Sequence, residues 1–179
     1  MLLDIPSRSR SLNTGHITGL VDFVADLIST GGPRPDNYAE LNRQIRRVGD
    51  DIRGGVISSE SVRQHLDEVC DKQLEGTLQA MAQSKPHGYS GDFQMIDAIY
   101  SLRTSRDPRL RLWDLFFHSQ AAPCAVRNRK QYFHEVLASL PVNADGSRHR
   151  VLNVGCGPAR DLKEWFAGDH PQKLFFDCV

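Results

Sequence analysis

Two glycines near the C-terminal end of the sequence stand where a nucleotide-binding turn is expected. Gly155 and Gly157 follow a β-prone run at residues 150–154 and precede a segment with helical spacing. Gly155 permits a sharp turn, and Gly157 lets the backbone come close to a ligand. A dinucleotide site needs a small residue at the position of Arg160. The pattern therefore disfavours NAD and FAD and favours a cofactor with an adenosine but no pyrophosphate; the alternative is a tight turn without a ligand.

The loop at residues 85–92 is a second candidate site. Its glycines, proline and polar groups can hold Tyr89 and Asp92 at fixed positions over a pocket. Tyr89 could donate a hydrogen bond to a substrate or cofactor carboxylate. Asp92 could accept one from a cofactor amino group, or orient Tyr89. The structural alternative is that Asp92 only caps the following helix while Tyr89 packs beneath it, and both roles can coexist.

A basic run at residues 125–130 provides a third candidate. Helical spacing predicts that Arg127 and Lys130 share a face and that Arg129 projects elsewhere. A guanidinium is the natural bidentate partner of a carboxylate, so we predict that Arg127 binds an acidic substrate. Basic residues outnumber acidic ones by six over residues 103–160. A solvated helix face, or a docking surface for an acidic partner such as a carrier protein, explains that excess equally well.

Metal and nucleophile chemistry are not expected. The four cysteines are far apart and form no CxxC pair: Cys70, Cys124, Cys156 and Cys178. No histidine is near Cys156 in the sequence, and a small thiol suits a tight turn, so packing is its expected role. His118 and His134 lack a metal-ligand partner three or four residues away. We therefore predict reduced thiols and no metal site.

Apolar spacing predicts a helical chain that ends in a strand–turn–helix–strand unit. Residues 1–15 show little periodicity and are expected to form a loose arm. We predict helices at residues 16–30, 36–52, 59–83, 93–100, 108–120, 125–140 and 159–166, and strands at residues 150–154 and 174–179.

The predicted fold class is α/β. We expect a helical N-terminal or lid domain at residues 16–142, followed at residues 148–179 by the first βαβ unit of a Rossmann-like sheet. One βαβ unit leaves its sheet edges unpaired and cannot bury its own core. We therefore expect that the sequence is a fragment of a longer enzyme, or else that another chain completes the sheet.

Composition excludes several classes of protein. The 179 residues include 22 basic and 22 acidic side chains, which gives no electrostatic pull toward nucleic acid or an anionic membrane. The 40% hydrophobic and 25% charged residues are typical of globular proteins. No signal-peptide run and no transmembrane stretch is visible. We expect a cytoplasmic protein with no stable membrane insertion, whose oligomeric state the sequence leaves open.

Three motifs together resemble a known family. The segment Val151-Leu-Asn-Val-Gly-Cys-Gly-Pro-Ala-Arg-Asp-Leu162 resembles motif I of class I S-adenosylmethionine-dependent methyltransferases. Lys85-Pro-His-Gly-Tyr-Ser-Gly-Asp-Phe-Gln-Met-Ile-Asp97 and Ala125-Val-Arg-Asn-Arg-Lys130 are similar to the bacterial 3-hydroxypalmitic acid methyl ester biosynthesis proteins. The resemblance covers roughly residues 84–179. It implies that a helical region precedes a Rossmann-like core.

The resemblance also implies a cofactor, S-adenosyl-L-methionine, and a site for it. Gly155 and Gly157 match the glycines that line the cofactor, and we place Cys156, Arg160 and Asp92 in the same site. The sequence departs from the family pattern in two ways. Asn153 replaces the acid that many class I enzymes have there, and the ribose-binding acid would follow Val179, with Asp177 as an uncertain substitute.

The implied reaction is methylation of the carboxyl group of a hydroxy fatty acid, giving a methyl ester that serves as a cell-density, or quorum-sensing, signal. A carboxylate is already ionised at neutral pH, so the reaction needs no strong base. The protein must align the acceptor oxygen with the methyl group and exclude water. We predict that Tyr89 and Arg127 position the carboxylate. The alternative is a non-catalytic helical module that binds an acyl ligand or a protein, with a vestigial nucleotide-binding segment.

Overall fold

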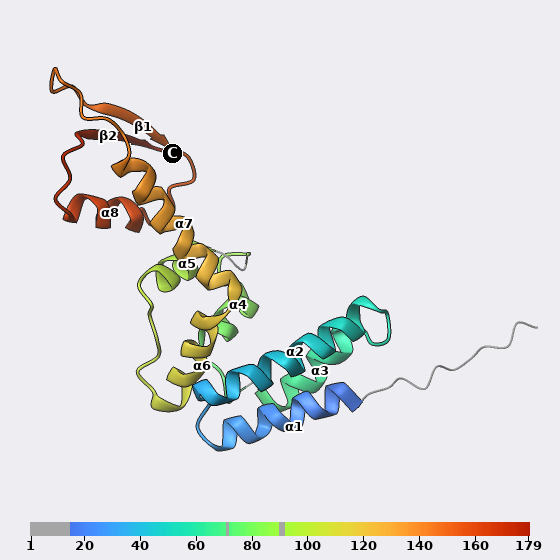
Figure 1. Ribbon diagram of the computed structural model, residues 1–179. Helices are drawn as coiled ribbons and strands as arrows, with labels where there is room; N and C mark the ends of the chain where they lie inside the picture. The colour runs from blue at the N-terminus through green and yellow to red at the C-terminus, as the bar shows by residue number, and fades with distance from the viewer. Residues whose placement is uncertain (1–14, 71, 90–91) are drawn as a thin grey trace, which may run out of the picture. The chain divides into compact units, whose positions relative to one another are not determined.

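The computed structural model describes residues 15–70, 72–89 and 92–179 (Figure 1). The chain divides into two compact units, Met1–Glu75 and Gly76–Val179. The described part is mostly helical and has a two-stranded parallel sheet, which agrees with the α/β class at that level. The predicted arm at residues 1–15 lies, except for Gly15, outside the described residues.

The first unit is helical. Its elements are α1 (Gly15–Ser29), the 3-10 helix η1 (Pro35–Asn37), α2 (Tyr38–Arg53) and α3 (Ser59–Cys70). Apolar residues at three- and four-residue spacing form the buried face of α1: Ile17, Leu20, Val24 and Leu27. Helix α1 ends before Gly31 and Gly32, whose positive φ angles no longer follow the helix. The predicted helices at residues 16–30 and 36–52 are therefore confirmed within two residues at each end.

The single helix predicted over residues 59–83 is wrong. Helix α3 ends at Cys70, and a separate helix α4 spans Leu78–Ser84. Thr77 begins α4 as its N-cap, because its hydroxyl oxygen accepts a hydrogen bond from the Ala80 amide at 3.2 Å. Gly76, with φ of 88°, breaks the helical path just before this cap. Leu74 and Leu78 kept the helical spacing across the interruption, which is why the periodicity missed it.

The second unit joins helices to the small sheet. Its elements are α4, α5 (Phe93–Tyr100), α6 (Pro108–Ser119), α7 (Ala121–Ala138), β1 (His149–Asn153), α8 (Arg160–Ala167) and β2 (Leu174–Cys178). Asp107 caps α6 by accepting a hydrogen bond from the Arg109 amide. Helix α7 begins four residues earlier than predicted. Pro123 fits in its first turn because amides there need no partner within the helix.

The strands β1 and β2 pair in parallel, with Val151 opposite Phe176. Helix α8 follows β1 and returns the chain to β2, in the order that the sequence predicted (Figure 1). The core on this side of the unit consists of Leu137 from α7, Trp165 from α8 and Leu174 from β2. Helix α7 packs with α8 and β2 in this core, and the two compact units of the structure divide at Glu75 and Gly76. The domain boundary predicted between residues 142 and 148 stays a prediction.

A second core holds the helical side of this unit together. It consists of Leu78 from α4 and Met95, Ala98 and Ile99 from α5, with Phe117 of α6 and Val126 of α7 among the partly buried residues around it. The buried carboxylate of Asp114 in α6 accepts hydrogen bonds from the amides of Leu78 at 2.8 Å and Ser105 at 2.7 Å. One side chain therefore fixes both the start of α4 and the chain before α6.

Candidate functional site

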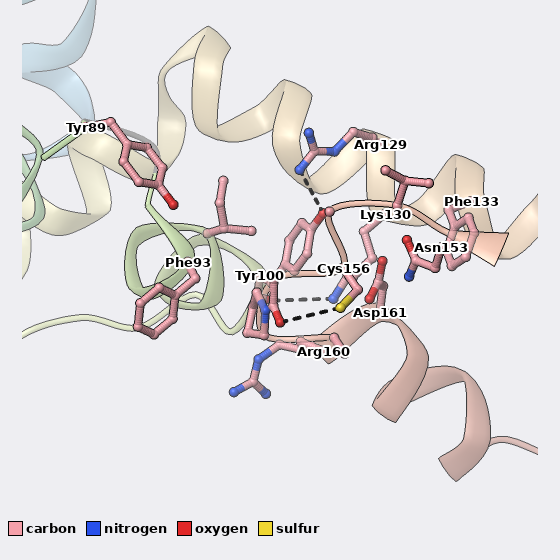
Figure 2. A pocket seen from close by; sticks show the side chains of 16 residues that line it. Tyr89, Phe93, Tyr100, Arg129, Lys130, Phe133, Asn153, Cys156, Arg160 and Asp161 are labelled. Carbon is pink, nitrogen blue, oxygen red and sulfur yellow. Dashed lines mark hydrogen bonds between the residues drawn. The ribbon is translucent and has the colours of Figure 1, made fainter. Parts of the chain in front are cut away.

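A cavity of about 440 Å³ opens within the second unit. Its volume lies in the range of ~300–1,000 Å³ that is usual for small-molecule sites. Three parts of the chain line it: α5 with the loop before it, α7, and the turn between β1 and α8 (Figure 2). The residues whose side chains line it include Tyr89, Phe93, Ile96, Tyr100, Arg129, Lys130, Phe133, Asn153, Cys156, Arg160 and Asp161.

The turn after β1 has the open geometry that the two glycines predicted. Gly155 and Gly157 have φ angles of 68° and 51°, in the left-handed region where side chains are unfavourable. A Cβ atom built at either glycine would meet no atom within 4 Å. The Gly155 amide donates to the Val179 carbonyl at 2.7 Å, which ties the turn to the end of β2. Both glycines therefore border open space on a fixed stretch of backbone.

Asn153 provides an unused hydrogen-bond donor beside this turn. It ends β1 and lines the cavity, and its Nδ2 atom is buried without a partner among the described residues. A buried amide without a partner is costly, and a bound ligand with an acceptor would satisfy it. The sequence flagged this position only as a departure from a family pattern, so the donor itself was missed.

Cys156 lies half-buried in the turn and lines the cavity. Burial raises the pKa of the nearby Cys178 thiol, and the Cys156 side chain raises it further. The Cys178 thiol therefore stays protonated at neutral pH.

Among the described residues no group of histidine, cysteine, aspartate and glutamate side chains could hold a metal ion.

The Arg160 side chain extends from the end of the turn to α5. Its Nε and Nη2 atoms lie 2.5 Å and 3.0 Å from the two carboxylate oxygens of Asp97 in α5, and its guanidinium points away from Cys156 (Figure 2). This hydrogen bonding lowers the pKa of the Asp97 carboxyl. A large residue is tolerated at this position because its side chain reaches α5 instead of lying against a strand. Sequence reasoning missed Asp97, which is 63 residues away and belongs to no spacing pattern.

Lys130 links α7 to α8. Its ammonium lies 2.5 Å from the Glu164 carboxylate and 5.1 Å from the centre of the Tyr100 ring. Arg129, the next residue, also lines the cavity, and its Nη2 atom donates to the Tyr100 hydroxyl at 3.2 Å. Arg129 has no acidic partner among the described residues, whereas both other cations of the cavity have one.

Arg127 lies outside the cavity lining. Its Nη2 atom donates to the His118 carbonyl at 2.8 Å, at the end of α6. Arg127 and Lys130 are half-buried and Arg129 is exposed, in agreement with the predicted faces of α7, but it is Arg129 and not Arg127 that lines the cavity together with Lys130. The Arg127 side chain lies against the end of α6, whereas the long side chains of Arg129 and Lys130 both reach the cavity. A substrate role for Arg127 stays a prediction.

Tyr89 and Asp92, which the sequence assigned to one site, lie in different environments in the structure. Tyr89 lines the cavity and is 55% exposed, so it does not pack beneath the helix. Asp92 is 1% exposed and caps α5, where its Oδ1 atom accepts from the Met95 amide at 2.9 Å. It is not among the lining residues, so the structure shows its capping role, and its cofactor role stays a prediction.

Comparison with known proteins identified no matching family model, curated protein or solved structure. Within residues 15–70, 72–89 and 92–179, no helix is both long enough and apolar enough to cross a lipid bilayer. The methyltransferase resemblance therefore rests on the sequence motifs alone.

Proposed function

We propose that the cavity binds S-adenosyl-L-methionine and that the protein transfers its methyl group to an anionic acceptor. The observation that carries the proposal is the turn at Gly155 and Gly157, which follows a parallel strand, precedes a helix and borders open space. In this proposal β1, α8 and β2 are the first βαβ unit of a Rossmann-like methyltransferase sheet. Ligands of such sheets bind at the carboxyl ends of the strands, where this turn lies.

The lining residues fit this cofactor. The open positions beside Gly155 and Gly157 leave room for a ribose against the backbone, and the unpaired Asn153 amide can donate to a cofactor oxygen or ring nitrogen. Aromatic rings of α5 offer a surface for an adenine or a sulfonium, since cations are attracted to ring faces. When bound, the cofactor supplies an activated methyl group.

Arg129 is the best-placed group for the acceptor. It is the cation of the cavity that has no acidic partner among the described residues, and its guanidinium is held beside Tyr100. A carboxylate can accept two parallel hydrogen bonds from such a guanidinium. Arg129 thus takes the role that the sequence assigned to Arg127, and the Tyr89 hydroxyl can donate to the same carboxylate.

The apolar lining is compatible with an acyl chain. Phe93 and Ile96 of α5 and Phe133 of α7 contribute apolar side chains to the lining. We therefore keep a hydroxy fatty acid, free or on an acyl carrier, as the proposed acceptor. Its carboxylate needs only orientation and exclusion of water, because it is already a nucleophile at neutral pH.

A second candidate function is a protein-binding module without catalysis. Leu152 of β1 and Phe175 of β2 are exposed on the sheet face opposite α8. Exposed apolar side chains on neighbouring strands are typical of surfaces that a partner covers. This candidate predicts that the cavity binds no nucleoside.

Calorimetric titration of the chain with S-adenosylhomocysteine tests the proposal. We expect binding by the unchanged protein and its loss in Gly157→Val, whose side chain would occupy the open space beside the turn. Gly146→Val is the matched control, because Gly146 also has a positive φ, 73°, but lies outside the cavity. Absence of binding up to about 1 mM nucleoside, a free energy near −4 kcal/mol, would contradict the proposal. So would equal affinities of the two variants.

A further inference from the structure

Two ion pairs join α8 to the neighbouring helices beside the cavity. Arg160 at the first residue of α8 holds Asp97 of α5 with two hydrogen bonds. One turn further along, Glu164 of α8 pairs with Lys130 of α7. Both pairs connect elements that are distant in the sequence, 63 and 34 residues apart.

Among the residues that the structure describes, neither of these two hydrophobic cores contains both α5 and α8. Helix α5 belongs to the core of Leu78 and Met95, whereas α8 belongs to the core of Trp165 and Leu174. Helix α7 contributes to both cores. The position of α5 relative to the glycine turn therefore depends on α7 and on the Asp97–Arg160 pair.

This pair lies between two of the three walls of the cavity, α5 and the turn between β1 and α8. Asp97 directly follows Ile96, and Ile96 lines the cavity together with Phe93 and Tyr100 of the same helix. Arg160 directly follows the turn that carries Gly155 and Gly157. Separation of Asp97 from Arg160 would therefore change the distance between the lining residues of α5 and the glycine turn.

From this arrangement we infer that Asp97 and Arg160 are positioning residues that hold the α5 wall against the glycine turn and so set the width of the cavity. Lys130 and Glu164 brace the α7 wall in the same way. Only the identity of the ligand rests on the proposed function. The ion-paired brace is a property of the protein without a ligand.

The expected effect on global stability distinguishes the positioning role of the Asp97–Arg160 pair from a purely structural one. The Asp97 and Arg160 side chains are 32% and 30% exposed, and ion pairs with such exposure contribute little to global stability. The two-pronged geometry nevertheless fixes the orientation of both partners. Loss of the pair should therefore reduce the fraction of molecules with a formed cavity while the melting temperature hardly changes.

The test compares Asp97→Asn, Arg160→Gln, the double neutral variant and the exchanged pair Asp97→Arg with Arg160→Asp. The matched control is Arg150→Gln, which removes an Arg–Asp pair on the strands outside the cavity. We expect Asp97→Asn to weaken S-adenosylhomocysteine binding about tenfold, as when one molecule in ten keeps the competent cavity. The control should bind like the unchanged protein. The exchanged pair should recover most of the affinity, or, if it does not fold, the double neutral variant should bind no more weakly than Asp97→Asn.

Amide hydrogen exchange supplies a readout that needs no ligand. In Asp97→Asn, amide exchange should accelerate over residues 93–100 and 155–163 and stay unchanged in β1 and β2. If the unchanged protein binds no nucleoside, the proposed function fails, and the exchange data alone decide on the brace. Unchanged exchange in Asp97→Asn, or unchanged affinity where the parent binds, overturns the inference, as does an equal effect in Arg150→Gln.

Discussion

Arg129 and Tyr100 meet in the lining of the cavity, with the guanidinium Nη2 atom 3.2 Å from the phenolic oxygen (Figure 2). The Lys130 ammonium lies over the same tyrosine ring. Tyr100 therefore orients one cation by its hydroxyl and contacts the other by its ring face. Lys130 is neutralised by Glu164, so Arg129 carries the charge that remains for an anionic ligand.

Replacement of Arg129 by Gln should selectively impair use of an acidic acceptor. Loss of a charge-assisted hydrogen bond costs about 1.5–3 kcal/mol, which corresponds to a rise in KM of roughly 10- to 100-fold. Methyl ester formation from a hydroxy fatty acid and labelled S-adenosyl-L-methionine, followed by mass spectrometry, measures the effect. S-adenosylhomocysteine affinity should stay unchanged.

Arg127→Gln is the informative comparison for that experiment, since Arg127 contacts the α6 end and not the cavity. We expect its KM for the acid to stay near that of the unchanged protein. A larger increase in Arg127→Gln than in Arg129→Gln would restore the assignment made from the sequence.

Removal of the Tyr89 hydroxyl should lower kcat/KM for the acceptor. Tyr89→Phe keeps the ring but loses a donor worth about 1 kcal/mol, so a decrease of roughly fivefold is expected. Tyr132→Phe serves as the control, because Tyr132 is an exposed residue of α7 outside the cavity lining. If both variants keep full activity, the Tyr89 hydroxyl does not contact the acceptor.

Local signals in the sequence predicted much of the fold. The buried stripe of α1, the cap Asp92 and the turn at Gly155 all involve residues within a few positions of one another. Such features are encoded by backbone preference and by apolar spacing, which a single sequence displays. The interruption between α3 and α4 was not predicted, because Leu74 preserved the helical spacing across it.

The side-chain partners at the site could not be predicted in this way. The Asp97–Arg160 and Lys130–Glu164 pairs depend on how α5, α7 and α8 pack, and no periodicity relates residues so far apart. The choice between Arg127 and Arg129 likewise depended on which neighbour each long side chain reaches. A helical-wheel rule places Cβ atoms and does not place guanidinium groups.

Asp114→Ala should destabilise the second unit strongly. The substitution leaves the amides of Leu78 and Ser105 without their acceptor in a buried setting, at a cost of about 1–3 kcal/mol for each unsatisfied group. Urea denaturation followed by circular dichroism measures the change. Asp107→Ala, which removes the exposed cap of α6 and a surface ion pair with Arg109, should cost about 1 kcal/mol. Equal losses in the two variants would show that the buried Asp114 network is not important for stability.

The Asp97–Arg160 pair should resist moderate acid. Hydrogen bonding from Arg160 lowers the pKa of the Asp97 carboxyl below its ordinary value of 3.8, so the folded protein holds the proton less tightly than the unfolded chain. The stabilisation by this pair is therefore present above pH 3.8 and is lost as the pH falls through the lowered folded-state pKa. Asp97→Asn lacks this titration.

The difference in the free energy of local opening between the unchanged protein and Asp97→Asn, over residues 93–100 and 155–163, should accordingly stay constant from pH 7 to about pH 5 and shrink only in stronger acid. Amide hydrogen exchange at a series of pH values gives this difference directly. A difference that vanishes already near neutral pH would mean that Asp97 does not hold Arg160 as a carboxylate, and the brace on the cavity would lose its electrostatic basis. High salt supplies an independent check, because screening should weaken this partly exposed pair at every pH above that range.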